Sequence, residues 1–199
     1  MYRFLGKKEP LKIYKTQSKS LQKISAVASH LPKLLLTNQV QKTIDALNKN
    51  DFSVQKIIKL NSKDEINLAM SQVSFIAHAY IWGGSKPMQV LPEVISKPWV
   101  DLSNYLGRPP ILSYASYCLD NWYKINPKKP ITLDNVALIN NFLGGVDEDW
   151  FVTIHVCIED AAGDAIEAAK KLSTMNKNNS HKDFLNELKK IKKSLKNVN

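Results

Sequence analysis

The chain has 199 residues, and 44% of them are hydrophobic, which is enough to form the core of one domain or slightly more. This composition excludes a disordered protein. Only seven glycines are present and helical spacings dominate, so we expect a mostly α-helical fold. The net charge of +10 is concentrated near both ends, while the middle of the chain is nearly balanced. Solvated lysine-rich surfaces explain this distribution better than a nucleic-acid site, although basic ends fit both.

The two cysteines, Cys118 and Cys157, lie in apolar helical patterns, which indicates free buried thiols in a reducing compartment. No CxxC or other metal-ligand spacing is present, so we expect no metal ligands in this chain. The first residues lack the apolar run of a signal peptide, and no apolar stretch approaches the ~20 residues of a membrane span. We therefore expect a cytoplasmic protein without a membrane partner.

The chain opens with residues 1–19, which are polar and irregular and are expected to form an arm. Apolar residues at helical spacing then predict a first helix at about 21–36. Pro32 is expected to kink this helix or to end it early. A second, shorter helix is predicted at 39–47.

The clearest predicted helix begins at Ser62, because Ser62 and Glu65 have the spacing of a capping box. Gly83-Gly84 is expected to end this helix with a left-handed residue. Residues 85–110 hold five of the nine prolines, interspersed with apolar side chains, and are predicted to form an ordered connector without a helix.

The remaining segments are predicted to be helical again. The expected helices run from about 113 to 124, from Thr132 or Asp134 through Phe142, and from about 149 to 172. A last amphipathic helix carries four apolar residues on one face, namely Phe184, Leu188, Ile191 and Leu195.

The helix at 149–172 differs from the others because its first half is apolar nearly all round. Such a helix is normally buried on most sides. Only about 27 residues follow it, and they form a polar loop and one helix. We therefore expect an exposed apolar face on this helix and a chain that is incomplete by itself.

His155 is the histidine with the clearest chemical potential, since it shares a helix face with Phe151 and Glu159. One interpretation is a core histidine, and the other is a general base or hydrogen-bond acceptor facing an apolar pocket. Tyr114, Tyr117 and Cys118 share another helix face. Their side chains belong either to the hydrophobic core or to the lining of a pocket. Motifs of proteases, kinases, nucleotide-binding proteins and zinc enzymes are absent.

Several segments, in order along the chain, resemble the indoleamine 2,3-dioxygenase family of haem enzymes. The resemblance rests on AHAYIWG, on LGRPPILSYA after LP and PW, on NW followed by PKKPIT, and on FVTIHVCIEDAAGDAI. It spans most of this chain but only about the first half of a family member. By this resemblance the fold is all-α, with a small helical cap domain at 1–142 and the first helices of a larger haem-binding domain at 143–199.

The family resemblance also implies a site. Tyr114, Tyr117 and Cys118 fall at positions that line the distal, substrate-binding side of the haem pocket. Phe151 matches a phenylalanine that contacts the indole ring. His155 falls where some members carry serine and others a histidine that accepts a hydrogen bond from the indole N–H, so this resemblance favours the pocket interpretation.

The implied reaction uses haem and O₂ to cleave the indole C2–C3 bond of tryptophan or another indole, giving N-formylkynurenine. The family's iron-binding histidine and its carboxylate-binding arginine lie beyond residue 199, so we expect this chain to be inactive alone and to need a separately encoded C-terminal half. The alternative is a non-catalytic helical interaction module or a decaying gene product. A nucleic-acid binder that uses the basic ends is a weaker third hypothesis.

Overall fold

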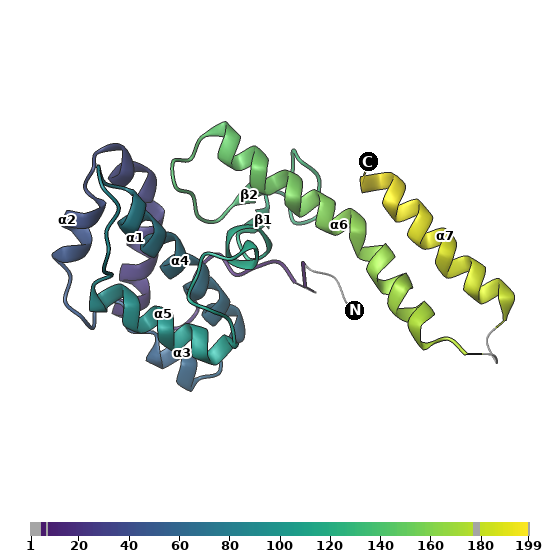
Figure 1. The fold of residues 1–199 in the computed structure, drawn as a ribbon, viewed down its shortest axis with the longest axis horizontal. Helices are drawn as coiled ribbons and strands as arrows, with labels where there is room; N and C mark the ends of the chain where they lie inside the picture. Colours follow the sequence, from purple (N-terminus) through teal and green to yellow (C-terminus); the bar gives the residue numbers. More distant parts are fainter. Residues whose placement is uncertain (1–4, 7, 177–179, 199) are drawn as a thin grey trace.

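The structure is a computed structural model that describes residues 5–6, 8–176 and 180–198. Five helices form one body, and two further helices form a hairpin that projects from it (Figure 1). The body contains α1 (Lys19–Leu36), α2 (Val40–Asp45), α3 (Gln55–Lys59), α4 (Lys63–Trp82) and α5 (Glu93–Leu106). A π-helical turn η1 (Ala115–Leu119) and the strands β1 (Trp122–Lys124) and β2 (Val136–Leu138) lead to α6 (Val146–Thr174) and α7 (His181–Val198).

Helix α4 is the centre of the body, and 14 of its 20 residues are buried. Helices α1, α2, α3 and α5 and the turn η1 all pack against it. Its buried polar side chains therefore bond to neighbouring elements, as buried polar groups must. The Ser74 hydroxyl accepts a hydrogen bond from the Trp99 indole of α5 at 2.9 Å. The Ser71 hydroxyl donates to the backbone carbonyl of Ser116 in η1 at 2.8 Å.

The start of α4 at Ser62 is as predicted, but the capping box is wrong. The Ser62 hydroxyl donates to the Glu65 carboxylate at 2.6 Å and not to the helix backbone. The carboxylate instead accepts the backbone N–H groups of Lys15 and Thr16 at 2.8 and 2.7 Å. Glu65 thus fixes the irregular amino-terminal arm against α4, a long-range role that local spacing cannot reveal.

The predicted early end of the first helix at Pro32 and the left-handed stop at Gly83-Gly84 are wrong, and a kink at Pro32 stays a prediction. Helix α1 continues through Pro32 to Leu36 because Leu31, just before the proline, is buried in the core. Gly83 ends α4 with a φ of −80°, so this residue is not left-handed.

The predicted proline-rich connector contains helix α5, with Pro98 inside it. Val94, Ile95 and Trp99 are buried on its inner face, and this burial outweighs the hydrogen bond that Pro98 cannot donate. Helix α5, unlike α4, ends with a left-handed glycine, because Gly107 has a φ of 62°. The short helix α3 was not predicted either, because five residues are too few for a clear period.

The predicted helices at 113–124 and 132–142 are also wrong. The first shortens to the turn η1, and both segments contribute strands that pair antiparallel with Trp122 opposite Leu138. Trp122, Val136 and Leu138 are buried on one side of this small sheet, which suits aromatic and branched side chains. The fold is therefore mostly helical with one two-stranded sheet, and not all-α.

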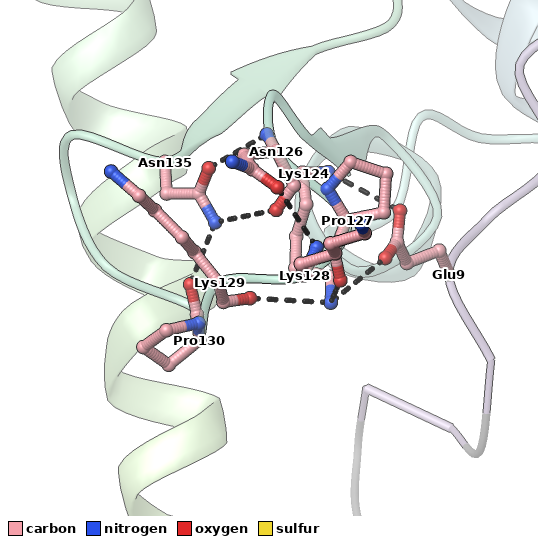
Figure 2. A network of polar contacts seen from close by, with 8 residues as sticks. All are labelled: Glu9, Lys124, Asn126, Pro127, Lys128, Lys129, Pro130 and Asn135. Atoms are coloured by element: carbon pink, nitrogen blue, oxygen red, sulfur yellow. Dashed lines mark hydrogen bonds and ion pairs between the residues drawn. The ribbon is translucent and has the colours of Figure 1, made fainter.

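The loop between the strands is closed by side chains (Figure 2). The Asn135 amide donates to the carbonyls of Asn126 and Pro130, and the Asn126 N–H donates back to Asn135 at 2.8 Å. The Lys124 ammonium donates to the Pro127 carbonyl at 2.7 Å and lies 3.3 Å from the Glu9 carboxylate. The loop is thereby tied to the arm as well as to itself.

Two hydrophobic clusters support the chain. The larger one fills the body around α4. The smaller one joins the sheet and η1 to the first half of α6, through Cys118, Trp122, Val152 and Val156 among others. The division at residue 142 stays a prediction. Within the described part of the chain, no helix is long and apolar enough to cross a membrane.

We predict that Glu65→Gln lowers the free energy of unfolding by about 2 kcal/mol, because two partly buried backbone N–H groups lose a charged acceptor. Burial alone raises the pKa of Glu65, but the hydrogen bonds from Ser62, Thr16 and Lys15 lower it overall. This stabilisation is therefore complete above the unfolded value of 4.5 and is lost as pH falls through the lower folded pKa.

Urea unfolding at pH 7 and at pH 3 measures this effect. The variant should differ from the native chain at pH 7 and converge with it in acid. The control is Asp64→Asn, which neutralises an exposed carboxylate one residue away. An equal loss of stability in both variants at pH 7 would contradict the assignment.

Candidate functional site

The predicted site residues meet where η1 packs against α6. Tyr114 immediately precedes η1, Tyr117 belongs to it, and Phe151 and His155 lie one turn apart on α6. The ring centroids are 5.9 Å apart for Tyr117 and Phe151, 4.4 Å for Phe151 and His155, and 5.8 Å for Tyr114 and His155. The structure therefore brings the four rings into one aromatic cluster.

The protonation of His155 follows from its hydrogen bond. Its Nδ1 lies 2.5 Å from the backbone carbonyl oxygen of Phe151, one turn earlier in α6. A carbonyl oxygen only accepts, so Nδ1 carries the proton. In the neutral ring, Nε2 then has a free lone pair and is a hydrogen-bond acceptor. His155 is half-buried beside two aromatic rings, so a planar ligand with an N–H group suits it.

Glu159 was expected to lie beside His155, but its hydrogen bond is with Tyr114. The Tyr114 hydroxyl donates to the Glu159 carboxylate at 2.9 Å. Burial and this bond together raise the pKa of Tyr114. The bond joins the residue before η1 to α6, one turn after His155. Sequence spacing identified Glu159 as a neighbour of the site and missed its partner, which is 45 residues away.

Tyr117 and Cys118 are adjacent in sequence but differ in their surroundings. Tyr117 is half-buried and packs on Phe75 and Phe142 as well as on Phe151. Burial, and then the Glu148 charge, raise its pKa to about 12. Cys118 is fully buried in the smaller hydrophobic cluster, and burial raises its pKa to about 11. The thiol of Cys118 does not reach the surface. Its substrate-binding role stays a prediction.

Sequence reasoning missed the loop that connects β2 to α6. Glu148, in the first turn of α6, accepts the backbone N–H groups of Phe142, Leu143 and Gly144 at 2.7, 2.9 and 3.0 Å. This holds the Phe142 ring 4.6 Å from Phe75 and next to Tyr117. An acidic residue in a first helical turn was the only local signal.

Part of the apolar surface of α6 is exposed, as the sequence predicted. Phe151 is 49% exposed and Ile158 is 37% exposed, and Val146 and Trp150 are exposed as well. The aromatic cluster therefore lies at the edge of an open apolar surface and not inside a closed core.

The fold and this cluster define a mostly α-helical protein with a histidine and aromatic side chains at an apolar surface. The family model for indoleamine 2,3-dioxygenase matches residues 2–199, and the chain belongs to that family.

Three relatives illustrate the similarity. The chain is 36% identical over 162 residues to indoleamine 2,3-dioxygenase of Saccharomyces cerevisiae, which covers 78% of this chain. It is 33% identical over 150 residues to indoleamine 2,3-dioxygenase 1 of Rattus norvegicus, and 28% identical over 174 residues to indoleamine 2,3-dioxygenase 2 of Homo sapiens, which cover 74% and 86% of it. These matches span only 35%, 36% and 42% of the relatives' own lengths.

The family implies a haem, which needs an apolar surface for its ring and an axial ligand for its iron. The exposed rings of Phe151 and Tyr114 suit the first need. Nε2 of His78 is not free to serve as the axial ligand, because this atom accepts a hydrogen bond from the backbone N–H of Leu112 at 3.2 Å. Among the described residues, no group of three or more His, Cys, Asp and Glu can hold a bare metal ion. The exposed aromatic surface thus suits the plane of a haem ring.

We predict slow thiol chemistry, because burial raises the pKa of both Cys118 and Cys157. At pH 8 Cys118 of the native chain should react with a disulfide reagent at least ~100-fold more slowly than Cys118 of the urea-unfolded chain. Cys157, which is half-buried, should react before Cys118, which is buried. Rates measured on Cys118→Ser and Cys157→Ser separate the two thiols, and faster reaction at Cys118 would contradict its burial.

Proposed function

We propose that this chain forms the distal, substrate-facing part of an indoleamine 2,3-dioxygenase-type haem pocket. In this proposal residues 1–142 are the cap domain and residues 143–199 begin the haem-binding domain. The observation that carries it is the bond from His155 to the Phe151 carbonyl, which leaves Nε2 as an acceptor at an open aromatic surface.

In the complete enzyme, bound haem supplies the activation of O₂ for cleavage of the indole C2–C3 bond, with N-formylkynurenine as the product from tryptophan. This chain orients the indole. Nε2 of His155 accepts the indole N–H, and the exposed ring of Phe151 packs on the indole plane. The Tyr114 ring, which the bond to Glu159 holds, lies edge-on to the imidazole with the ring centroids 5.8 Å apart. Orientation in a water-poor pocket is a recognised source of rate enhancement.

The axial ligand and the carboxylate-binding arginine are proposed to come from sequence that this chain does not match. The relatives are more than twice as long as the segments that align here. In this proposal residues 1–199 need that remaining sequence for activity and are inactive without it.

A second candidate function is a non-catalytic interaction module. It is supported by the exposed apolar side chains along α6 and α7, including Ile158, Leu188 and Leu195. Such side chains mark interaction surfaces when they form a contiguous patch.

We predict that the purified chain alone gives no stable histidine-ligated haem when titrated with haemin. The reason is that the iron ligand is proposed to lie in the part of the family sequence that this chain does not match. Absorbance in the Soret region measures the outcome, with the His155→Ala and His30→Ala variants titrated in parallel. A sharp, stoichiometric histidine-ligated band would contradict the prediction, and its loss in one variant would identify the ligand.

We predict that His155→Ala lowers kcat/KM about 10-fold in an enzyme reconstituted with the remaining sequence of the yeast relative. The expected loss is that of one hydrogen bond in the transition state. The melting temperature of the variant should stay close to that of the native chain. His30→Ala is the matched control, since His30 is exposed on α1 and bonds one turn back in the same way. Equal losses of activity and stability at His155 would restore the core-histidine interpretation.

A further inference from the structure

The loop that connects β2 to α6 is folded around one carboxylate. One oxygen of Glu148 accepts the backbone N–H of Phe142 at 2.7 Å. Its other oxygen accepts the backbone N–H groups of Leu143 and Gly144 at 2.9 and 3.0 Å. Successive N–H groups that converge in this way form a nest, which is a backbone site for an anion. Because Glu148 lies in the first turn of α6, the chain fills this nest with a charge of its own.

The last position of the nest needs a glycine. Gly144 has a φ of 70°, a left-handed conformation that residues with a Cβ rarely adopt. A left-handed residue at the end of such a run helps successive N–H groups to point to one side. Gly144 and Glu148 are therefore two separate requirements of the nest, and either can be changed without altering an aromatic side chain.

The nest fixes a ring that supports the aromatic cluster. Phe142, whose N–H lies in the nest, packs on Phe75 with the ring centroids 4.6 Å apart and on Tyr117 at 6.2 Å. Phe75 and Tyr117 also contact each other, at 5.5 Å. Phe75 is fully buried on α4. The three rings thus form a triangle of contacts with one corner in the core and one at the nest.

Tyr117 connects this triangle to the candidate site. Its ring lies 5.9 Å from that of Phe151, which in turn lies 4.4 Å from the His155 ring. Phe151 is 49% exposed, so about half of its surface lacks protein neighbours that could orient it. The contact with Tyr117 is therefore important for the tilt of the Phe151 ring, and a displaced Tyr117 would change that tilt.

We propose that Glu148 is a positioning residue for substrate binding, because by holding Phe142 it fixes Tyr117 and thereby the exposed ring of Phe151. This inference rests on the proposed function, in which Phe151 packs on the indole plane. Such packing is present in the bound substrate as well as in the transition state. Its loss should therefore raise KM and leave kcat nearly unchanged.

A simpler role for Glu148 is to stabilise the start of α6 through the helix dipole. Asp147 lies in the same turn and is exposed, so its carboxylate would act on the dipole in a similar way. Asp147→Asn is therefore the matched control for Glu148→Gln, since each variant removes one negative charge from the same turn.

Amide hydrogen exchange of the purified chain, followed by NMR, tests the nest. In Glu148→Gln the amides of Phe142, Leu143 and Gly144 should exchange about 10-fold faster, because they lose a charged acceptor. Gly144→Ala should have the same effect, since alanine disfavours the left-handed conformation. Asp147→Asn should leave the three amides unchanged. Circular dichroism checks that the helices are kept, and Gly144→Ala decides the result if Glu148→Gln unfolds.

The ring signals of Tyr117 and Phe151 in the same spectra report the positioning without any need for activity. They should shift in Glu148→Gln and in Gly144→Ala, and stay in place in Asp147→Asn. In the enzyme reconstituted with the remaining sequence of the yeast relative, both nest variants should raise KM for tryptophan about 5-fold. Their kcat should stay within about 2-fold of the native value.

Three results would overturn the proposal. They are unchanged amide exchange in both nest variants, unchanged ring signals of Tyr117 and Phe151, and an active enzyme in which KM is unchanged or rises equally in Asp147→Asn. A reconstituted enzyme that is inactive with the native chain would count against the proposed function instead. The ring signals would then still decide whether Glu148 positions Phe151.

Discussion

The burial of α4 on nearly all sides is the constraint on which the rest of the structure depends. A helix in that position leaves its polar side chains no access to water, so each must find a partner on another element. Glu65 accepts hydrogen bonds from the amino-terminal arm, Ser74 accepts one from Trp99 on α5, and Ser71 donates one to the carbonyl of Ser116. The same helix therefore supplies the core and fixes the relative positions of three separate segments.

The candidate site follows from the last of these bonds. By holding η1, the Ser71 bond sets the backbone from which Tyr114 and Tyr117 reach α6. A second buried pair, Asn121 and Asn140, ties the end of η1 to the segment after β2 at 2.8 and 2.9 Å. π-Helical turns are rare and often occur at functional sites, where the extra residue redirects side chains. The aromatic cluster around His155 is thus positioned partly by polar groups outside the rings, of which Asn121 also donates to the backbone carbonyl of Tyr117 at 3.2 Å.

The hairpin of α6 and α7 differs from the body in the kind of side chain that it buries. In the body, most apolar residues face inward and the buried polar side chains of α4 are paired. In the hairpin, Glu187 and Ser194 make the contact while Leu188 and Leu195 stay at the surface. Apolar area left exposed in this way is stabilised by contact with another surface. The hairpin and the aromatic cluster therefore both leave apolar side chains at the surface.

The sequence by itself determined the long helices, because the apolar periods of α1, α4, α6 and α7 extend over several turns. It also determined the family, through segments in a fixed order, and the exposed face of α6. Only the tertiary structure decided that Glu65 bonds the arm, that Tyr114 bonds Glu159, that residues 122–138 pair as strands, and that a helix continues through Pro98. Local patterns report contacts up to about four residues apart. These decisions came from partners tens of residues away or from burial against another element, where packing outweighs local preference.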